Sequence, residues 1–173
     1  MPIRAAVLVA LAACLAPACA AEPSPCDDIS YARDFKVRYP GEVNKVFDVE
    51  YKQQMAWSAR AKAIGDRVVD VGAATRADQN ASYLALAKSA PIVALENRAQ
   101  KSADEFRLRN DTLLATPALS LLDPGRPNRA WCLLATQALQ SLNDKVNAEI
   151  ESWSALDRAL LASAASKGVQ FAN

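Results

Sequence analysis

The sequence predicts an all-α protein: an elongated antiparallel bundle of three helices, or of four if a proline divides the middle one. Two features of composition favour helices, because 51% of the 173 residues are hydrophobic and only 5 are glycine, whereas a turn-rich all-β protein contains more glycine. The third observation is periodicity. Apolar residues recur at three- and four-residue steps through three long stretches and not at every second residue.

The first twenty residues have the layout of a bacterial secretory signal. Arg4 gives a positive start, residues 5–13 are apolar, and the segment ends with the small residues Ala18-Cys19-Ala20. The apolar run is too short to span a membrane, which takes about 20 residues, and such a signal is removed after export. We therefore expect residues 1–20 to be a signal peptide and the mature protein to be soluble in a bacterial periplasm.

A second processing route is open at Cys14. The segment Leu11-Ala12-Ala13-Cys14 resembles the Leu-small-small-Cys pattern of bacterial lipoproteins, in which the cysteine carries the lipid. Cysteine parity favours the first route, since cleavage before Cys14 leaves Cys19 as a spare thiol beside the pair Cys26 and Cys132. Under the second route, the lipid on Cys14 would be the protein's contact with the membrane.

Residues 21–41 are expected to form a tether and an N-terminal arm. The segment Tyr39-Pro40-Gly41 predicts a turn, because proline presets φ and glycine accepts a positive φ. A helical bundle domain then spans residues 42–168, and residues 169–173 form a tail.

The first long helix is predicted at about residues 42–71, with Gly72 as its C-terminal cap. Its apolar positions follow a helical period. They are Val43, Val46, Phe47, Tyr51, Met55, Trp57, Ala61, Ile64, Val68 and Val71.

The second helix is predicted to begin at Thr75-Arg76-Ala77-Asp78, which has the S/T-x-x-D/E form of a capped start. Pro91 lacks an N–H and clashes with the preceding turn, so it should kink the helix or restart it. The helix should end by Thr116-Pro117, where a proline-rich loop over 117–128 begins.

The third helix is predicted to start after Asn128, which can cap it, and to run to about Lys167 before Gly168. Its seam alternates steps of four and three residues, as in a coiled coil. The seam positions are Ala135, Leu139, Leu142, Val146, Glu149, Trp153, Leu156 and Leu160.

Cys26 and Cys132 are expected to form a disulfide, since an exported protein meets an oxidising compartment. A link that closes a loop of about 106 residues is worth roughly 4–5 kcal/mol. We expect the starts of the first and third helices to lie at opposite ends of the bundle, so the 27–38 arm should run along the bundle to bring Cys26 to Cys132. The alternatives are a redox pair and an intermolecular link.

Composition excludes several kinds of site. The sequence has no histidine, which removes Ser-His-Asp and Cys-His catalysis and histidine metal ligands. Two mature cysteines are too few for a Cys₄ zinc site, neither glycine-rich phosphate-binding pattern occurs, and 20 basic against 19 acidic residues give no basic excess for nucleic acid. We expect no enzyme activity, cofactor, metal or nucleic-acid partner. A hydrolase that uses two carboxylates is the remaining enzymatic alternative.

Glu149 breaks the seam of the third helix with a charge. A charged side chain there must be paired or must reach water. Either Glu149 extends to solvent while Ile150 packs inward, or it forms a buried pair with Arg98 or Arg109 that fixes the helix register. A functional pocket is the third alternative.

Binding residues often lie on loops at the end of a rigid scaffold. The predicted partner-binding residues are Leu121, Leu122, Arg126, Arg129 and Trp131. We expect a bacterial envelope protein that binds another envelope or secreted protein, as an inhibitor, immunity or accessory protein, through the 119–131 loop or the bundle surface. The alternative is a periplasmic carrier of apolar ligands or lipids, or a holdase chaperone. The wide apolar stripe of the third helix leaves a homodimer open.

Overall fold

The computed structural model describes residues 23–115 and 125–171. In these two ranges the chain forms a short 3-10 helix, η1 (Pro25–Asp27), and four α-helices: α1 (Ile29–Asp70), α2 (Arg76–Ala87), α3 (Ala90–Leu114) and α5 (Pro127–Ser166). Neither range contains a strand. The prediction of an all-α helical bundle is therefore confirmed.

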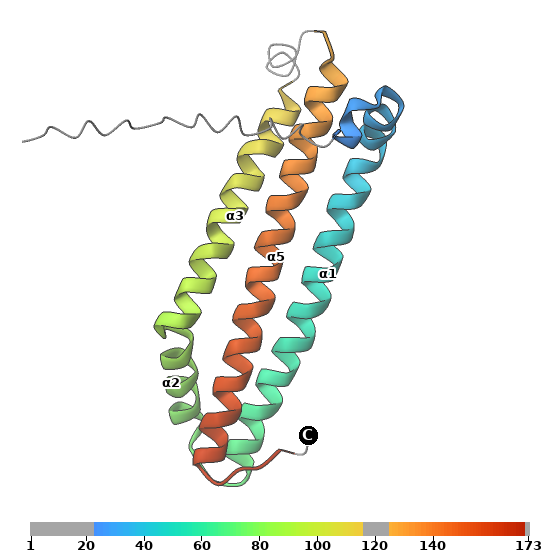
Figure 1. Ribbon diagram of the computed structural model, residues 1–173. Helices are drawn as coiled ribbons and strands as arrows, with labels where there is room; N and C mark the ends of the chain where they lie inside the picture. The colour runs from blue at the N-terminus through green and yellow to red at the C-terminus, as the bar shows by residue number, and fades with distance from the viewer. Residues whose placement is uncertain (1–22, 116–124, 172–173) are drawn as a thin grey trace, which may run out of the picture.

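The helix α5 is the centre of the bundle. Figure 1 shows α5 between α1 on one side and a column made of α2 and α3 on the other. The helices α1 and α5 run in the same direction, and α2 and α3 return in the opposite one. In the described ranges the backbones of α1 and α3 do not come close to each other. They meet through long side chains, such as Phe47 and Phe106, whose ring centroids are 6.3 Å apart.

The helix α1 begins earlier than the sequence indicated. Asp28 caps it, since its carboxylate accepts two backbone N–H groups of the first turn. The helix then continues through Pro40 and Gly41, so the prediction of a turn at 39–41 is wrong. Pro40 has no N–H to donate to the carbonyl of Lys36, which bends a helix without always ending it. Figure 1 shows the first turns of α1, in blue, out of line with the rest of the helix.

The predicted disulfide between Cys26 and Cys132 is confirmed, with Cα atoms 5.6 Å apart and a sequence separation of 106 residues. The expected path of the 27–38 arm along the bundle is wrong. The first and third columns of an up-down-up bundle are parallel, so α1 and α5 start at the same end. Cys26 therefore meets Cys132 directly, and most of residues 27–38 form the first turns of α1.

The middle column is divided near Pro91, which was one of the two expected outcomes. The hydroxyl of Thr75 accepts the backbone N–H of Asp78 at 3.2 Å, and α2 begins as the capping box predicted. The helix α2 ends at Ala87, and α3 restarts at Ala90 with Pro91 in its first turn. A proline fits there because the first N–H groups of a helix have no intrahelical acceptor.

The helix ends were predicted better than the start of α5. Gly72 and Gly168 follow the ends of α1 and α5 with φ angles of 71° and 79°, a conformation that glycine adopts without strain from a Cβ atom. The helix α5 begins at Pro127, and its N-cap is Arg126, which makes no side-chain capping bond. Asn128 therefore lies inside the first turn and is not the cap.

Two apolar clusters bury opposite ends of α5. The disulfide cluster consists of Cys26, Ala32, Phe35, Tyr39, Leu113, Trp131, Cys132, Ala135 and Ala138. The distal cluster consists of Ile64, Val68, Ile92, Leu156, Leu160, Ala164 and Val169. Val169 lies in the predicted tail and is buried here. Between the clusters lie three charged residues, Glu50, Lys145 and Glu149, which we call the waist.

Candidate functional site

The contact site predicted around the proline-rich loop falls partly outside the described residues. Leu121 and Leu122 lie outside the described residues, and Arg126 is exposed. Trp131 is only 9% exposed, with its ring edge-on to Tyr39 at 5.4 Å between centroids. Trp131 is thus part of the disulfide cluster, where Phe35 and Tyr39 from the first turns of α1 pack on it.

Arg129, another predicted contact residue, ties α5 to the N-terminal segment. Its Nε donates to Asp27 Oδ1 at 2.6 Å. The hydrogen bond from this guanidinium lowers the pKa of Asp27 below the usual range of an aspartate. The pair is half-exposed, and ion pairs at such positions contribute little free energy. Arg129 therefore helps to hold η1 beside the start of α5.

The predicted pairing of Glu149 with Arg98 or Arg109 is wrong. Arg98 pairs with Glu151 across the α3–α5 surface, and Arg109 reaches Glu105 at 3.0 Å. The cation beside Glu149 is Lys145, one helical turn earlier on α5, with 3.0 Å between Nζ and Oε2. The two arginines lie on another side of α5, whereas Lys145 and Glu149 share the side that faces α1.

The waist brings two carboxylates to one ammonium group. Lys145 Nζ lies 2.6 Å from Glu50 Oε1 of α1 and also contacts Glu149. All three side chains are largely buried. One oxygen of each carboxylate, Glu50 Oε2 and Glu149 Oε2, is buried without a well-aligned hydrogen bond among the described residues. When both carboxyl groups are ionised, the waist carries one more negative than positive charge.

This surplus of negative charge acts on Glu149. Burial raises the pKa of the Glu149 carboxyl, the ammonium of Lys145 lowers it, and the neighbouring carboxylate of Glu50 raises it again, so that the net shift is upward. A buried carboxyl beside a like charge favours its neutral form. The Glu149 carboxyl thus takes up a proton more readily than an ordinary glutamate does.

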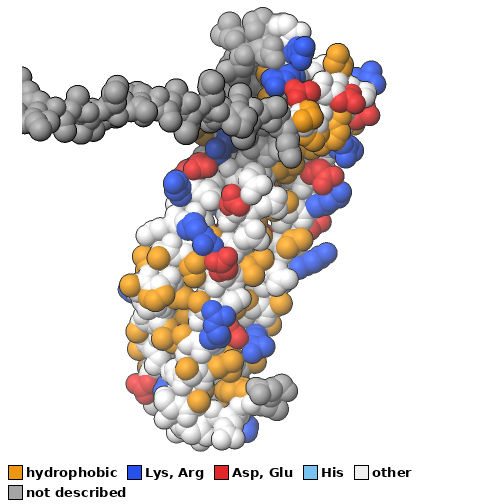
Figure 2. Space-filling view, viewed as in Figure 1, with side chains coloured by type: hydrophobic (Ala, Val, Ile, Leu, Met, Phe, Trp, Pro, Cys, Tyr) orange, Lys and Arg blue, Asp and Glu red, His pale blue; other side chains and the backbone are white. Residues whose placement is uncertain are grey.

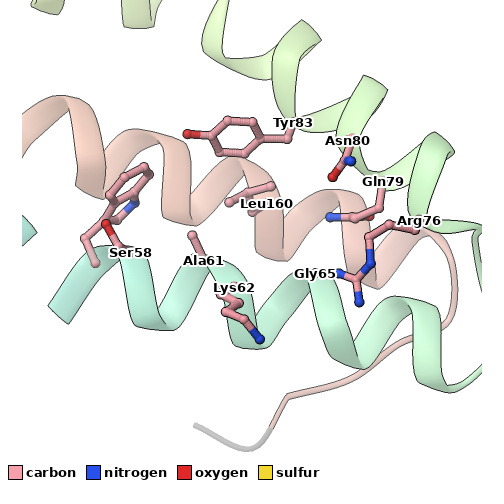
Figure 3. Close-up of a pocket in the computed structure, with 10 residues that line it drawn as sticks. Ser58, Ala61, Lys62, Gly65, Arg76, Gln79, Asn80, Tyr83 and Leu160 are labelled. Carbon is pink, nitrogen blue, oxygen red and sulfur yellow. The ribbon is translucent and has the colours of Figure 1, made fainter. Parts of the chain in front are cut away.

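A cleft lies between α1 and α2 near the distal cluster (Figure 3). Its volume is about 310 Å³, near the lower limit for small-molecule sites. Apolar and polar side chains both line it. The apolar ones are Trp57, Ala61, Tyr83 and Leu160, and the polar ones are Ser58, Lys62, Arg76, Gln79 and Asn80.

Gln79 is the most unusual residue of the cleft, because it is polar and only 7% exposed. Its Oε1 accepts from Lys167 at 3.5 Å, and no hydrogen bond from its Nε2 is found in the described ranges. Figure 3 shows this amide nitrogen directed into the space between Leu160 and Gly65. A Cβ atom on Gly65 would lie 3.6 Å from Gln79 Cγ. This is an ordinary van der Waals distance, so Gln79 lies directly over Gly65.

The rim of the cleft carries charge of both signs. Asp66 accepts from Lys62 at 2.6 Å and from Arg76 at 2.7 Å. These two cations lower the pKa of the Asp66 carboxyl. Two cations around one carboxylate leave a net charge of +1 at the rim, which would favour an anion or a hydrogen-bond acceptor.

Apolar side chains remain exposed along α1. Tyr51 and Met55 are 62% and 53% exposed, and with Phe47 they follow four-residue steps on one side of the helix. The predicted stripe of α1 is thus only partly buried, since α1 packs mainly on α5. On the face seen in Figure 2, hydrophobic side chains gather over the lower half and charged ones are denser above.

Comparisons with family models, with curated proteins and with solved structures found no match to this chain. Within residues 23–115 and 125–171, no helix has the length and hydropathy to cross a membrane. The same ranges hold no group of three His, Cys, Asp or Glu residues arranged for a metal ion.

Proposed function

We propose that this chain is an exported protein of the bacterial envelope, without catalytic activity, that binds another protein through the surface of its bundle. Export rests on the signal layout of residues 1–20, and the absence of catalysis rests on a sequence with no histidine. The observation that carries the proposal is the line of exposed side chains formed by Phe47, Tyr51 and Met55 on α1. We call this line the α1 stripe.

The α1 stripe has the composition of a contact surface. Aromatic residues and methionine are enriched at protein interfaces, whereas lysine and glutamate are depleted there. A tyrosine buries a large area at a low cost in side-chain entropy, which is why it so often dominates binding energy. Phe47 is anchored against Phe106 of α3, so the stripe is held in place at one end and open along the rest of α1.

The test compares two matched variants of the tagged mature protein, captured from solubilised envelopes. In the first variant, Tyr51→Glu and Met55→Glu place charge on the stripe. In the control, Leu108→Glu and Leu114→Glu place the same charge at two apolar positions of α3 that are 70% and 77% exposed. We expect one partner at near-equal amount with the wild type and with the control, and its loss with the stripe variant.

Two outcomes would contradict the proposal. The first is a partner that the wild type and the stripe variant capture equally. The second is the absence of any stoichiometric partner. Light scattering of the purified protein separates a third case, in which the stripe joins two copies of this chain, because the mass then doubles and the stripe variant restores the monomer.

A second function, binding of a small apolar ligand with an acceptor group, is favoured by the free Nε2 of Gln79 inside the cleft. Octanoate is a suitable probe, because its chain matches the apolar wall and its carboxylate matches the charge of the rim. A ligand that binds only the folded state raises the melting temperature. We expect octanoate to do so, an octyl trimethylammonium salt not to, and Gln79→Leu to abolish the effect.

A further inference from the structure

The waist is chemically different from the apolar clusters above and below it. Three ionisable side chains are largely buried there, and Lys145 of α5 contacts both Glu50 of α1 and Glu149 of α5. Charged groups withdrawn from water are costly unless each is paired. Here one cation serves two anions, so the pairing is incomplete when both glutamates are ionised.

Neighbouring charges do not complete the pairing. Charged residues of α3 face the other side of this stretch of α5, across a cleft whose lining includes Lys101, Glu105 and Asp144. Two arginines of α3 are engaged there. Arg98 pairs with Glu151, and Arg109 pairs with Glu105 and donates to Ser141.

One proton would complete the pairing. If Glu149 is protonated, its O–H can donate to the neighbouring Glu50 carboxylate, because both carboxyl groups contact the same ammonium group of Lys145. Lys145 then faces a single negative charge, and the waist becomes neutral. A buried oxygen that now lacks a well-aligned partner, Glu50 Oε2, would acquire one.

We propose that the waist is a proton-binding site, in which the Glu149 carboxyl holds one proton between Lys145 and Glu50, and that this proton strengthens the packing of α1 on α5. Glu50 comes from α1 and the other two residues come from α5, so loss of the proton places uncompensated charge between these two helices. The site is independent of the partner-binding function proposed above.

The sign of the pH effect follows from the upward shift of the Glu149 pKa. A carboxyl whose pKa is higher in the folded state binds more protons in the folded than in the unfolded chain. Its contribution to stability is complete below the unfolded-state pKa and is lost as the pH rises through the folded-state pKa. The contribution of Glu149 alone therefore favours the folded state on the acidic side of neutrality.

Direct titration tests the proposal on the wild-type mature protein with its disulfide intact. Carbon-13 NMR of the glutamate carboxyls follows each group with pH, and Glu149→Gln identifies the signal of residue 149. We expect the Glu149 carboxyl to titrate clearly above the value of about 4.3 for a glutamate in a peptide. A midpoint at or below that value overturns the proposal, whatever the variants do.

Melting temperatures across the pH range give a second test. Glu149→Gln replaces the carboxyl by a neutral group of the same size that can still donate to Glu50. We expect this variant to melt roughly 2–4 °C above the wild type at pH 8, and within about 1 °C of it at pH 4. The control Glu151→Gln removes an exposed carboxylate two residues away and should lack this pH-dependent gain. A gain for Glu149→Gln that is the same at both pH values, or a loss at pH 8, contradicts the proposal.

Discussion

The disulfide cluster and the distal cluster bury the two ends of α5 with different side chains. The disulfide cluster is aromatic and cross-linked, with Phe35, Tyr39 and Trp131 in edge-on contact around the Cys26–Cys132 bond. The distal cluster is aliphatic, with Ile64, Val68, Ile92, Leu156 and Leu160 and no covalent link.

The difference shows two ways of holding α1 to α5. At one end a bond joins η1 to α5, and the aromatic contacts add roughly 0.5–1.5 kcal/mol each beyond their burial. At the other end α1 is retained by close packing of aliphatic side chains, which is sensitive to any vacancy. The first end should therefore depend on redox state, and the second on side-chain volume.

The largest effect is expected from removing the cross-link with Cys26→Ser and Cys132→Ser. Urea unfolding of the mature protein should show a loss of about 4–5 kcal/mol, because the loop of 106 residues is no longer closed in the unfolded chain. Domains of this size are stable by only about 5–15 kcal/mol, so the loss is a large share of the total. Reduction of the wild type should have the same effect, and an unchanged unfolding midpoint would refute this account.

The next largest effect is expected from Leu160→Ala, which opens a vacancy in the distal cluster. Leu160 is 2% exposed, and truncation of such a leucine costs about 2–5 kcal/mol. Leu108→Ala on the surface of α3 is the matched control and should change stability by less than about 0.5 kcal/mol. The losses from Leu160→Ala and from reduction should add, because the two sites lie at opposite ends of the bundle. If the two losses in the free energy of unfolding did not add, the two clusters would be energetically coupled despite their separation.

The smallest effect is expected from Arg98→Ala, which removes the ion pair with Glu151 between the two clusters. Both side chains are more than half exposed, and surface pairs of this kind contribute about 0–1 kcal/mol. Urea unfolding should show a change at the low end of that range, and the change should become smaller still at high salt. A loss comparable to that of Leu160→Ala would show that charge, as well as burial, holds α3 to α5.

The ends of individual helices were predicted better from the sequence than the packing of one helix on another. Several helix boundaries follow local sequence signals. These signals are the capping box at Thr75, the restart near Pro91 and the glycines at 72 and 168. Pro40-Gly41 is a local signal too, but burial of Phe35 and Tyr39 on Trp131 favours continuing α1 through it. Tertiary packing thus outweighed turn propensity at that point.

The sequence indicated only part of the waist. Glu149 stood out as a charge in an apolar seam, and Lys145, four residues earlier, has the spacing of an ion pair on the same helix. Glu50 gave no comparable signal, because it is one of several charges on α1 and its position opposite Lys145 depends on the register between two helices. The cleft was missed for the same reason, since Gly65 and Gln79 meet only after α1 and α2 fold back on each other.

The central position of α5 has a consequence for the order in which the bundle can assemble. The helix α1 is synthesised first, yet the helix on which it packs is synthesised last, and contacts between segments so far apart in sequence form slowly. The apolar face of α1 stays uncovered until the chain beyond residue 127 has emerged, and uncovered apolar surface favours aggregation. Fewer residues separate α3 from α5 than separate α1 from α5. The pair of α3 and α5 should therefore form first, and α1 should then pack on it.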